Sequence, residues 1–93
     1  MFVNLSIHHP RLGYEADLIA SMHRFGAAAA GAPGLLQVAT LKDEESGRLI
    51  GLMVWTSRAA WEAGVGPSRA AVEHDDFDLW EEREPESFAA GEV

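Results

Sequence analysis

The histidines are the residues best suited to acid–base chemistry here, since an imidazole can both accept and donate a proton near neutral pH. His74 is the first candidate for a catalytic base, with an exposed histidine at a helix end as the alternative interpretation. Asn4 and His8 are further candidates, because a strand would place both on one polar face, where they could hold a carbonyl or phenolate. A rim position explains His8 equally well. His9 and His23 are interpreted as surface groups.

Other catalytic chemistries find little support in the residue spacing. The chain has no cysteine, which excludes disulfides, thiolate metal sites and a cysteine nucleophile. His8 and His9 point to opposite faces of a strand, and no histidine pair has helical ligand spacing, so we expect no metal. The sequence offers no Ser-His-Asp spacing on which to base a hydrolytic triad. Gly64 to Pro67 is too short to hold a phosphate, so no nucleotide or flavin cofactor is indicated.

Large apolar side chains could form a site for a flat aromatic or lipophilic ligand. The three tryptophans are interpreted first as packing residues, and Trp55 is the one expected to reach a pocket or an interface. The predicted substrate-binding residues are Phe2, Ser6, Met22, Phe25, Met53, Trp55 and Trp61.

The elements that must position these residues follow from hydrophobic spacing. Val3, Leu5 and Ile7 alternate with polar residues, as in a strand, and apolar residues then recur at helical spacing from Tyr14 to Ala29. Ser57 is a predicted N-cap. The predicted strands are 1–8, 35–41, 48–55 and 77–80, the predicted helices are 14–29, about 58–63 and about 67–74, and an acidic tail is expected over about 84–93.

This order, β-α-β-β-α-β, predicts a single α+β domain over 1–93 with a ferredoxin-like antiparallel sheet and its helices on one face. Both faces of the third strand are apolar, with Leu49 and Met53 on one and Leu52 on the other. Because helices can cover only one face, a second copy is expected to cover the other. The sequence therefore predicts a homodimer in which two sheets form a dimeric α/β barrel.

The net charge of −8 is concentrated at the carboxyl end. Acids and bases cancel over residues 1–72, whereas nine acids and only Arg83 follow from Glu73 onward. Such a segment repels phosphate backbones, so we expect no nucleic-acid partner, and we interpret its acids as a solvated face. No apolar run is long enough to cross a membrane and no signal peptide is recognisable, so a cytoplasmic location is expected.

Three stretches together resemble a known family. They are Pro33-Gly34-Leu35-Leu36, Val54-Trp55, and Ser57-Arg58-Ala59-Ala60-Trp61. Their W-x-S-x-x-A-W pattern is similar to that of the antibiotic biosynthesis monooxygenase superfamily of dimeric α+β barrels. The resemblance implies a homodimer with a pocket between each sheet and its own helices. It implies no single activity, because the superfamily contains oxygenases, heme-degrading enzymes, isomerases and members of unknown role.

The heme-degrading branch of that superfamily is the less favoured alternative. Its pattern has an Asn on the first strand, a Trp after the W-x-S helix and a His about ten residues further on. Asn4 and His74 match, but the Trp position is occupied by Gly64, with Trp61 one helical turn earlier. Heme is therefore possible in principle and not expected as a cofactor.

The leading hypothesis is a cofactor-independent monooxygenase acting on a small aromatic or quinol-like substrate. In that chemistry the protein supplies a base, hydrogen bonds to an anion and a dry cavity. Asn4, Ser6, His8 and His74 could provide the polar parts. The alternative is a non-catalytic dimer that binds a small hydrophobic ligand, or a stress-associated protein. Convergence of the polar face of the first strand with His74 on one cavity would favour an enzyme.

Overall fold

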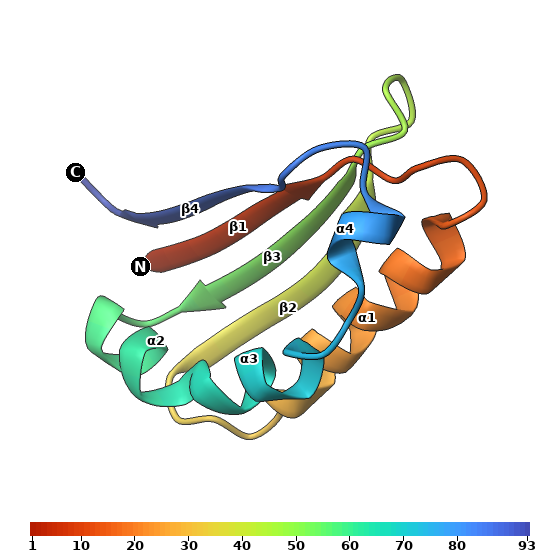
Figure 1. Ribbon diagram of the computed structural model, residues 1–93. Helices are drawn as coiled ribbons and strands as arrows, with labels where there is room; N and C mark the ends of the chain where they lie inside the picture. The colour runs from red at the N-terminus through yellow and green to blue at the C-terminus, as the bar shows by residue number, and fades with distance from the viewer.

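A four-stranded antiparallel sheet is the scaffold of the fold in the computed structural model, which describes all of residues 1–93 (Figure 1). The strands lie in the order β2-β3-β1-β4, and the helices cross one side of them. This α+β, ferredoxin-like arrangement confirms the predicted fold class. The strands are β1 Phe2–His8, β2 Leu35–Lys42, β3 Leu49–Trp55 and β4 Glu86–Gly91, and the helices are α1 Glu15–Ala28, α2 Arg58–Gly64, α3 Gly66–Val72 and α4 Phe77–Trp80.

Local signals in the sequence account for most of these boundaries. The Ser57 side chain accepts a hydrogen bond from the backbone N–H of Ala60, as an N-cap of α2 should. Gly47 has φ +78° in the turn between β2 and β3, a conformation that glycine adopts at little cost. Leu18 and Met22 of α1 are buried against Leu49 of β3, which anchors this helix to the sheet.

The predicted strand at residues 77–80 is wrong: these residues form the short helix α4. The Asp76 side chain accepts a hydrogen bond from the backbone N–H of Leu79 and caps this turn. The rings of Phe77 and Trp80 then meet edge to face, with centroids 5.9 Å apart. In a segment of only four residues, the spacing of Phe77 and Trp80 is also that of an i, i+3 contact in a helix. The pattern therefore does not distinguish a strand from one helical turn.

The fourth strand lies instead within the segment expected to be an acidic tail. β4 pairs antiparallel with β1 over residues 86–91 and completes the edge of the sheet. Its sequence, Glu-Ser-Phe-Ala-Ala-Gly, lacks the β-branched residues that mark a strand. Pairing with the exposed edge of β1 therefore determines its conformation, and no local preference indicates it.

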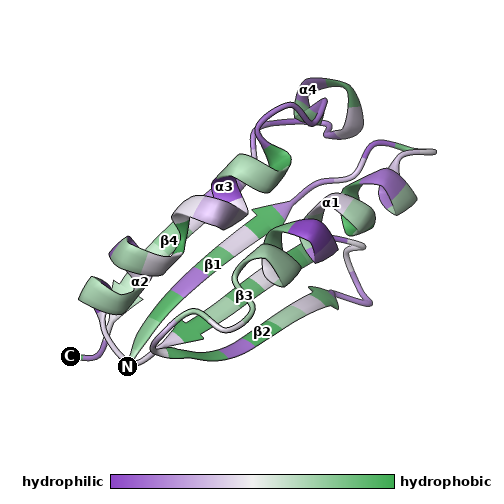
Figure 2. Ribbon diagram, turned by 90° about the horizontal axis from the view of Figure 1, so that it is seen from below, coloured by the Kyte–Doolittle hydropathy of each residue, from purple (hydrophilic) through white to green (hydrophobic).

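The two faces of the sheet differ sharply in what covers them. Helices α1, α2 and α3 lie over one face, and no helix lies over the other (Figure 2). Cross-strand pairs place Val3 with Val54 and Leu5 with Leu52 on the uncovered face. We call this surface the open face; its apolar members include Val3, Leu5, Ile7, Ile50, Leu52, Val54 and Phe88.

Trp55 lies at the centre of the core beneath the helices. Its side chain is fully buried and packs with Phe2, Ala29 and Met53. Gly64 of α2 contacts the same indole so closely that a Cβ atom there would lie 2.7 Å from Cζ3 of Trp55. Trp55 therefore secures α2 to the end of β3, and its position in the core excludes the predicted role at a pocket or an interface.

Candidate functional site

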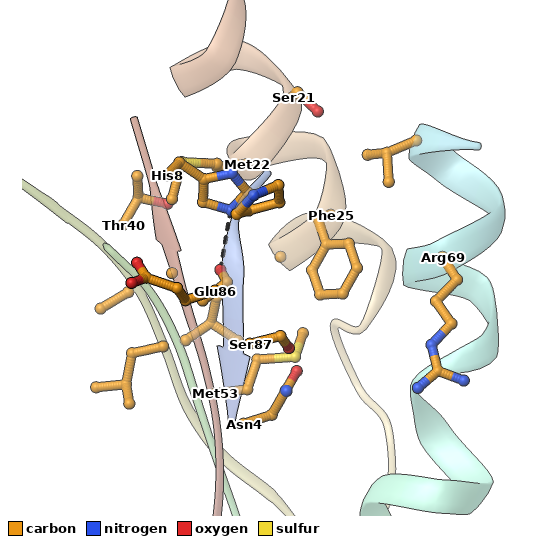
Figure 3. Close-up of a pocket in the computed structure, with 18 of the residues that line it drawn as sticks. Asn4, His8, Ser21, Met22, Phe25, Thr40, Met53, Arg69, Glu86 and Ser87 are labelled. Atoms are coloured by element: carbon orange, nitrogen blue, oxygen red, sulfur yellow. Dashed lines mark hydrogen bonds between the residues drawn. The ribbon is translucent and has the colours of Figure 1, made fainter. Parts of the chain in front are cut away.

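A cavity of about 460 Å³ lies between the covered face of the sheet and helices α1 and α3 (Figure 3). Polar side chains from β1 line its floor, and apolar side chains from α1, β3 and α2 line much of the rest. This confirms the expected pocket between the sheet and its own helices. The lining residues used below are Asn4, Ser6, His8, Ser21, Met22, Phe25, Gly51, Met53, Trp61, Arg69, Phe77 and Ser87.

Strand β1 supplies the polar residues through its alternation. Asn4, Ser6 and His8 all line the cavity, as the period of two predicts. The Asn4 amide donates to the backbone oxygen of Phe88 at 3.2 Å, which ties it to β4. Ser6 lies opposite Gly51 in the β1–β3 pairing, and a Cβ on Gly51 would come within 2.6 Å of the Ser6 hydroxyl. The missing side chain at Gly51 therefore makes room for this hydroxyl.

A hydrogen-bonded chain connects three polar side chains at one end of the cavity. His8 Nε2 lies 3.0 Å from Ser6 Oγ, and His8 Nδ1 lies 3.1 Å from Oε2 of Glu81. Figure 3 shows the His8–Ser6 contact as a dashed line. A carboxylate can only accept hydrogen bonds, so its imidazole partner Nδ1 carries the proton. Nε2 is then an acceptor, and Ser6 donates its hydroxyl proton to it.

The position of Glu81 is determined by its second oxygen and by its backbone. Oε1 of Glu81 accepts the backbone N–H of His9 at 3.1 Å, and the side chain is only 2% exposed. The Arg11 guanidinium donates to the backbone oxygens of Leu79 and Glu81 at 3.1 and 2.9 Å. These contacts hold the end of α4 beside the end of β1. Glu81 therefore keeps His8 in one tautomer and one orientation.

Helix α4 also shapes the surroundings of the imidazole. The ring of Phe77 lies 6.4 Å from that of His8 and forms part of the cavity wall. Trp80 packs on the inner side of α4 against buried residues of α1 and β3. An apolar wall next to an acid–base group excludes water and strengthens its electrostatic interactions.

The remaining lining of the cavity suits a flat, mostly apolar ligand. Four of the residues predicted to bind substrate, Met22, Phe25, Met53 and Trp61, line it, and their role in binding stays a prediction. The predicted Phe2 is not on the lining. It packs behind Trp61, with ring centroids 5.1 Å apart, and so supports that indole.

Arg69 of α3 brings a positive charge to the cavity. Its guanidinium lies 5.6 Å from the centroid of the Trp61 ring, within the range of a cation–π contact. Sequence reasoning did not single out this residue. Figure 3 shows its side chain extending from α3 on the side of the cavity away from His8.

Two carboxylates near the cavity, those of Asp75 and Glu86, have a lowered pKa. A hydrogen bond from Arg24, and then one from the Ser21 hydroxyl, lower the pKa of Asp75 below its ordinary value. The hydrogen bond from His9, followed by the charges of His9 and Arg83, lowers the pKa of Glu86. The His9–Glu86 contact measures 2.9 Å and fastens β4 to the end of β1. The acids after residue 73 therefore include structural partners, and are not solely a solvated face.

His74 does not converge with the other predicted site residues. Its side chain is 93% exposed, and its only ionic contact is with the neighbouring Glu73 at 3.4 Å. The residue follows the end of α3 and is absent from the cavity lining. The predicted catalytic role of His74 is therefore replaced by its alternative interpretation, an exposed histidine at a helix end.

The residues do not fit the heme-degrading pattern. Gly64 occupies the position of the tryptophan of that branch, and its close contact with Trp55 leaves no space for any side chain. The histidine of the pattern, His74, is exposed outside the cavity. No group of three or more His, Cys, Asp or Glu side chains is placed to hold a metal ion. No helix is long and apolar enough to cross a membrane.

Glu81 is the functional candidate that sequence reasoning missed. The acidic carboxyl end of the chain predicts a solvated group at this position, and Glu81 follows directly after residues 77–80, which the sequence predicts to be the last strand. A signal was present in the helix cap at Asp76 with aromatic residues one and four positions later, which indicates a helical turn. No sequence signal pairs residue 81 with residue 8, because that contact depends on the fold.

Comparison with solved structures supports this architecture. Rv0793 from Mycobacterium tuberculosis aligns with a TM-score of 0.80 at 13% identity, covering 99% of this chain and 94% of that protein. PA3566 from Pseudomonas aeruginosa gives 0.78 at 13% identity, covering 99% and 93%. A protein named antibiotic biosynthesis monooxygenase gives 0.76 at 11% identity, covering 100% and 99%. No protein-family model and no curated protein matches the sequence. The chain therefore shares its fold with these three proteins, and one of them carries the name of the family that the sequence resembles.

Proposed function

We propose that the protein is a cofactor-independent monooxygenase of the antibiotic biosynthesis type, acting on a small hydroxylated aromatic or quinol-like substrate. The observation that carries the proposal is the His8–Glu81 pair, which directs a basic Nε2 atom toward an apolar cavity. The fold shared with a protein of that name supports the reaction class. His8 takes the place of His74 as the base.

The proposed reaction begins with a proton transfer. A substrate hydroxyl takes over the hydrogen bond of Ser6 and gives its proton to His8 Nε2, while Glu81 stabilises the resulting imidazolium. The electron-rich anion then reduces dioxygen, and a ring carbon forms a bond to one oxygen atom. Cleavage of the O–O bond leaves one oxygen as a quinone carbonyl and releases the other as water. The substrate supplies all the electrons, so the scheme requires no cofactor.

The remaining lining residues bind and orient the substrate in this scheme. Met22, Phe25, Met53 and Trp61 contact its rings and exclude water from the anion. Arg69 is the cationic group that would attract a negatively charged substituent at the far side of the cavity.

A homodimer formed through the open face belongs to the same proposal. Val3, Leu5, Ile7 and Leu52 lie on this face, where the chain itself provides no cover. A second copy presents the same apolar surface, so a two-fold axis would bury both. Phe88, which is 51% exposed, would lose its contact with water in such a barrel.

Oxygen consumption tests the proposed activity directly. A panel of quinols and hydroxylated aromatics is mixed with the wild type and with His8→Gln, Glu81→Gln and the control His23→Gln, which changes an exposed histidine of α1. We expect uptake by the wild type and by the control, and a fall of about 10²–10⁴-fold in the His8 variant, the usual contribution of a general base. Equal uptake by wild type and His8→Gln would refute the proposal. Saturable tryptophan quenching without uptake by any variant would instead identify a binding protein.

A further inference from the structure

We infer that Ser6, His8 and Glu81 form a nucleophilic triad and give the cavity a second activity, the hydrolysis of small aryl or acyl esters through an acyl-Ser6 intermediate. This activity goes beyond the proposed oxygenation. It shares His8 and the cavity with it, but it does not depend on oxygen chemistry.

The connectivity of the three side chains is that of a hydrolytic triad. The nucleophile candidate, Ser6 Oγ, lies 3.0 Å from His8 Nε2, and the opposite ring nitrogen lies 3.1 Å from Glu81 Oε2. Both distances fall within the range required between a nucleophile, its base and the group that orients the base. Such triads are recognised by geometry, because the order of the three residues in the chain is not constrained.

Two features distinguish this chain from an incidental serine–histidine contact. Glu81 is almost completely buried and is held through its other oxygen by His9 N–H, so it cannot turn away from His8. Ser6 lies over Gly51, where an added Cβ would come within 2.6 Å of its hydroxyl and 3.4 Å of the Met22 methyl. The hydroxyl therefore occupies a space that only a glycine at position 51 leaves free, on the cavity floor.

The proposed reaction balances without any co-reactant except water. Ser6 Oγ attacks the ester carbonyl as its proton moves to His8 Nε2, and His8 then protonates the leaving alkoxide, which departs as an alcohol. The acyl group remains on Ser6. A water molecule gives a proton to His8 and attacks the acyl carbon. The C–O bond to Ser6 then breaks as His8 returns the proton to Ser6 Oγ, and a carboxylic acid is released.

The oxyanion formed during attack requires hydrogen-bond donors nearby. Ser87 is paired directly with Ser6 across β1 and β4, so the two side chains are neighbours on the face that lines the cavity. Ser87 and the Asn4 amide are side-chain donors, and strand pairing occupies the local backbone N–H groups. Because side-chain donors are less rigid than a backbone oxyanion hole, we expect slow turnover and an acyl-enzyme that accumulates.

Covalent labelling of Ser6 is the test of this inference. The wild-type protein is treated with p-nitrophenyl butyrate and, separately, with an alkyl fluorophosphonate, and the intact mass and the modified peptide are measured. We expect one added group on Ser6 and a burst of p-nitrophenolate. Ser6→Ala should lose both signals, whereas Ser46→Ala, at an exposed serine of the β2–β3 turn, should keep them.

Two further variants separate catalysis from folding. Ser6→Cys should give the burst and then stop at a thioester, which requires a folded site with a nucleophile at this position. Glu81→Gln presents an amide N–H to His8 Nδ1, so the proton of the imidazole moves to Nε2 and this nitrogen can no longer accept the Ser6 proton. For a positioning residue of this kind, kcat of ester hydrolysis should fall about 10²–10⁴-fold while KM stays unchanged. Labelling of Ser6→Ala at the wild-type rate, or an adduct on another residue, would overturn the inference. Acylation without oxygen uptake refutes only the proposed oxygenase, and oxygen uptake without acylation refutes only the triad.

Discussion

The two faces of β1 reverse the usual distribution of polarity in a sheet. Asn4, Ser6 and His8 point beneath the helices, whereas Val3, Leu5 and Ile7 point to the face that no helix covers. In an antiparallel sheet with one wet face, polar residues normally face the solvent. This reversal agrees with the proposed chemistry on the covered face and with the proposed dimer contact on the open face.

The polar side chains on the covered face can be buried because they form hydrogen bonds with one another. Both ring nitrogens of His8 have partners, and both oxygens of Glu81 accept hydrogen bonds. A buried polar group without a partner costs about 1–3 kcal/mol, so these residues stabilise the fold only as a set. The open face has no such network. The free energy gained by covering it depends on how much apolar area is removed from water.

The largest expected effect comes from breaking the open face. Leu52→Asp places a charge at the centre of the proposed dimer interface, and the two-fold axis repeats it in both copies. Desolvating two unpaired carboxylates should weaken dimerisation at least about 10³-fold. Analytical ultracentrifugation of Leu52→Asp against Leu12→Asp, at a loop residue that is 96% exposed, measures the change. A wild type that is monomeric, or a Leu52 variant that dimerises like the control, contradicts the comparison of the two faces.

A smaller effect is expected from filling the space above Gly51 on the covered face. Gly51→Ala puts a Cβ 2.6 Å from the Ser6 hydroxyl, so this hydroxyl and its hydrogen bond to His8 must shift. Overpacking of this kind costs about 1–3 kcal/mol in the free energy of unfolding. Gly66→Ala is the matched control, since nothing lies within 4 Å of the added Cβ there. Urea denaturation compares the two, and equal stability would show that Ser6 is not confined by Gly51.

The smallest expected effect concerns the junction between β4 and β1, where Glu86 contacts His9. The hydrogen bond from His9 lowers the pKa of Glu86 below its ordinary value of 4.5, so the contact stabilises the fold above that pH and is lost as the pH falls through the lower folded pKa. Because the Glu86 side chain is 49% exposed, the loss should be modest. Thermal unfolding from about pH 6 to about pH 3 should show a weaker acid dependence for Glu86→Gln than for the exposed control Glu44→Gln. Parallel curves for the two variants would mean that the contact adds no stability.

Short-range patterns were sufficient for most of the elements. The alternation in β1 and β3, the apolar spacing of α1 and the Ser57 cap each depend on residues within a few positions, so their physical cause is present in the local sequence. The same alternation placed Asn4, Ser6 and His8 on one face. The sequence by itself therefore determined the fold class and the floor of the cavity.

The tertiary structure alone decided which groups complete that floor. Glu81 reaches His8 across 73 positions, and β4 acquires its conformation by pairing with β1 rather than from strand-forming residues. His74, which has the expected chemistry, lies just beyond the end of α3 with its side chain in solvent. Long-range contacts of this kind arise when the chain buries its core around Trp55 and Leu18, and no local spacing of residue types encodes them.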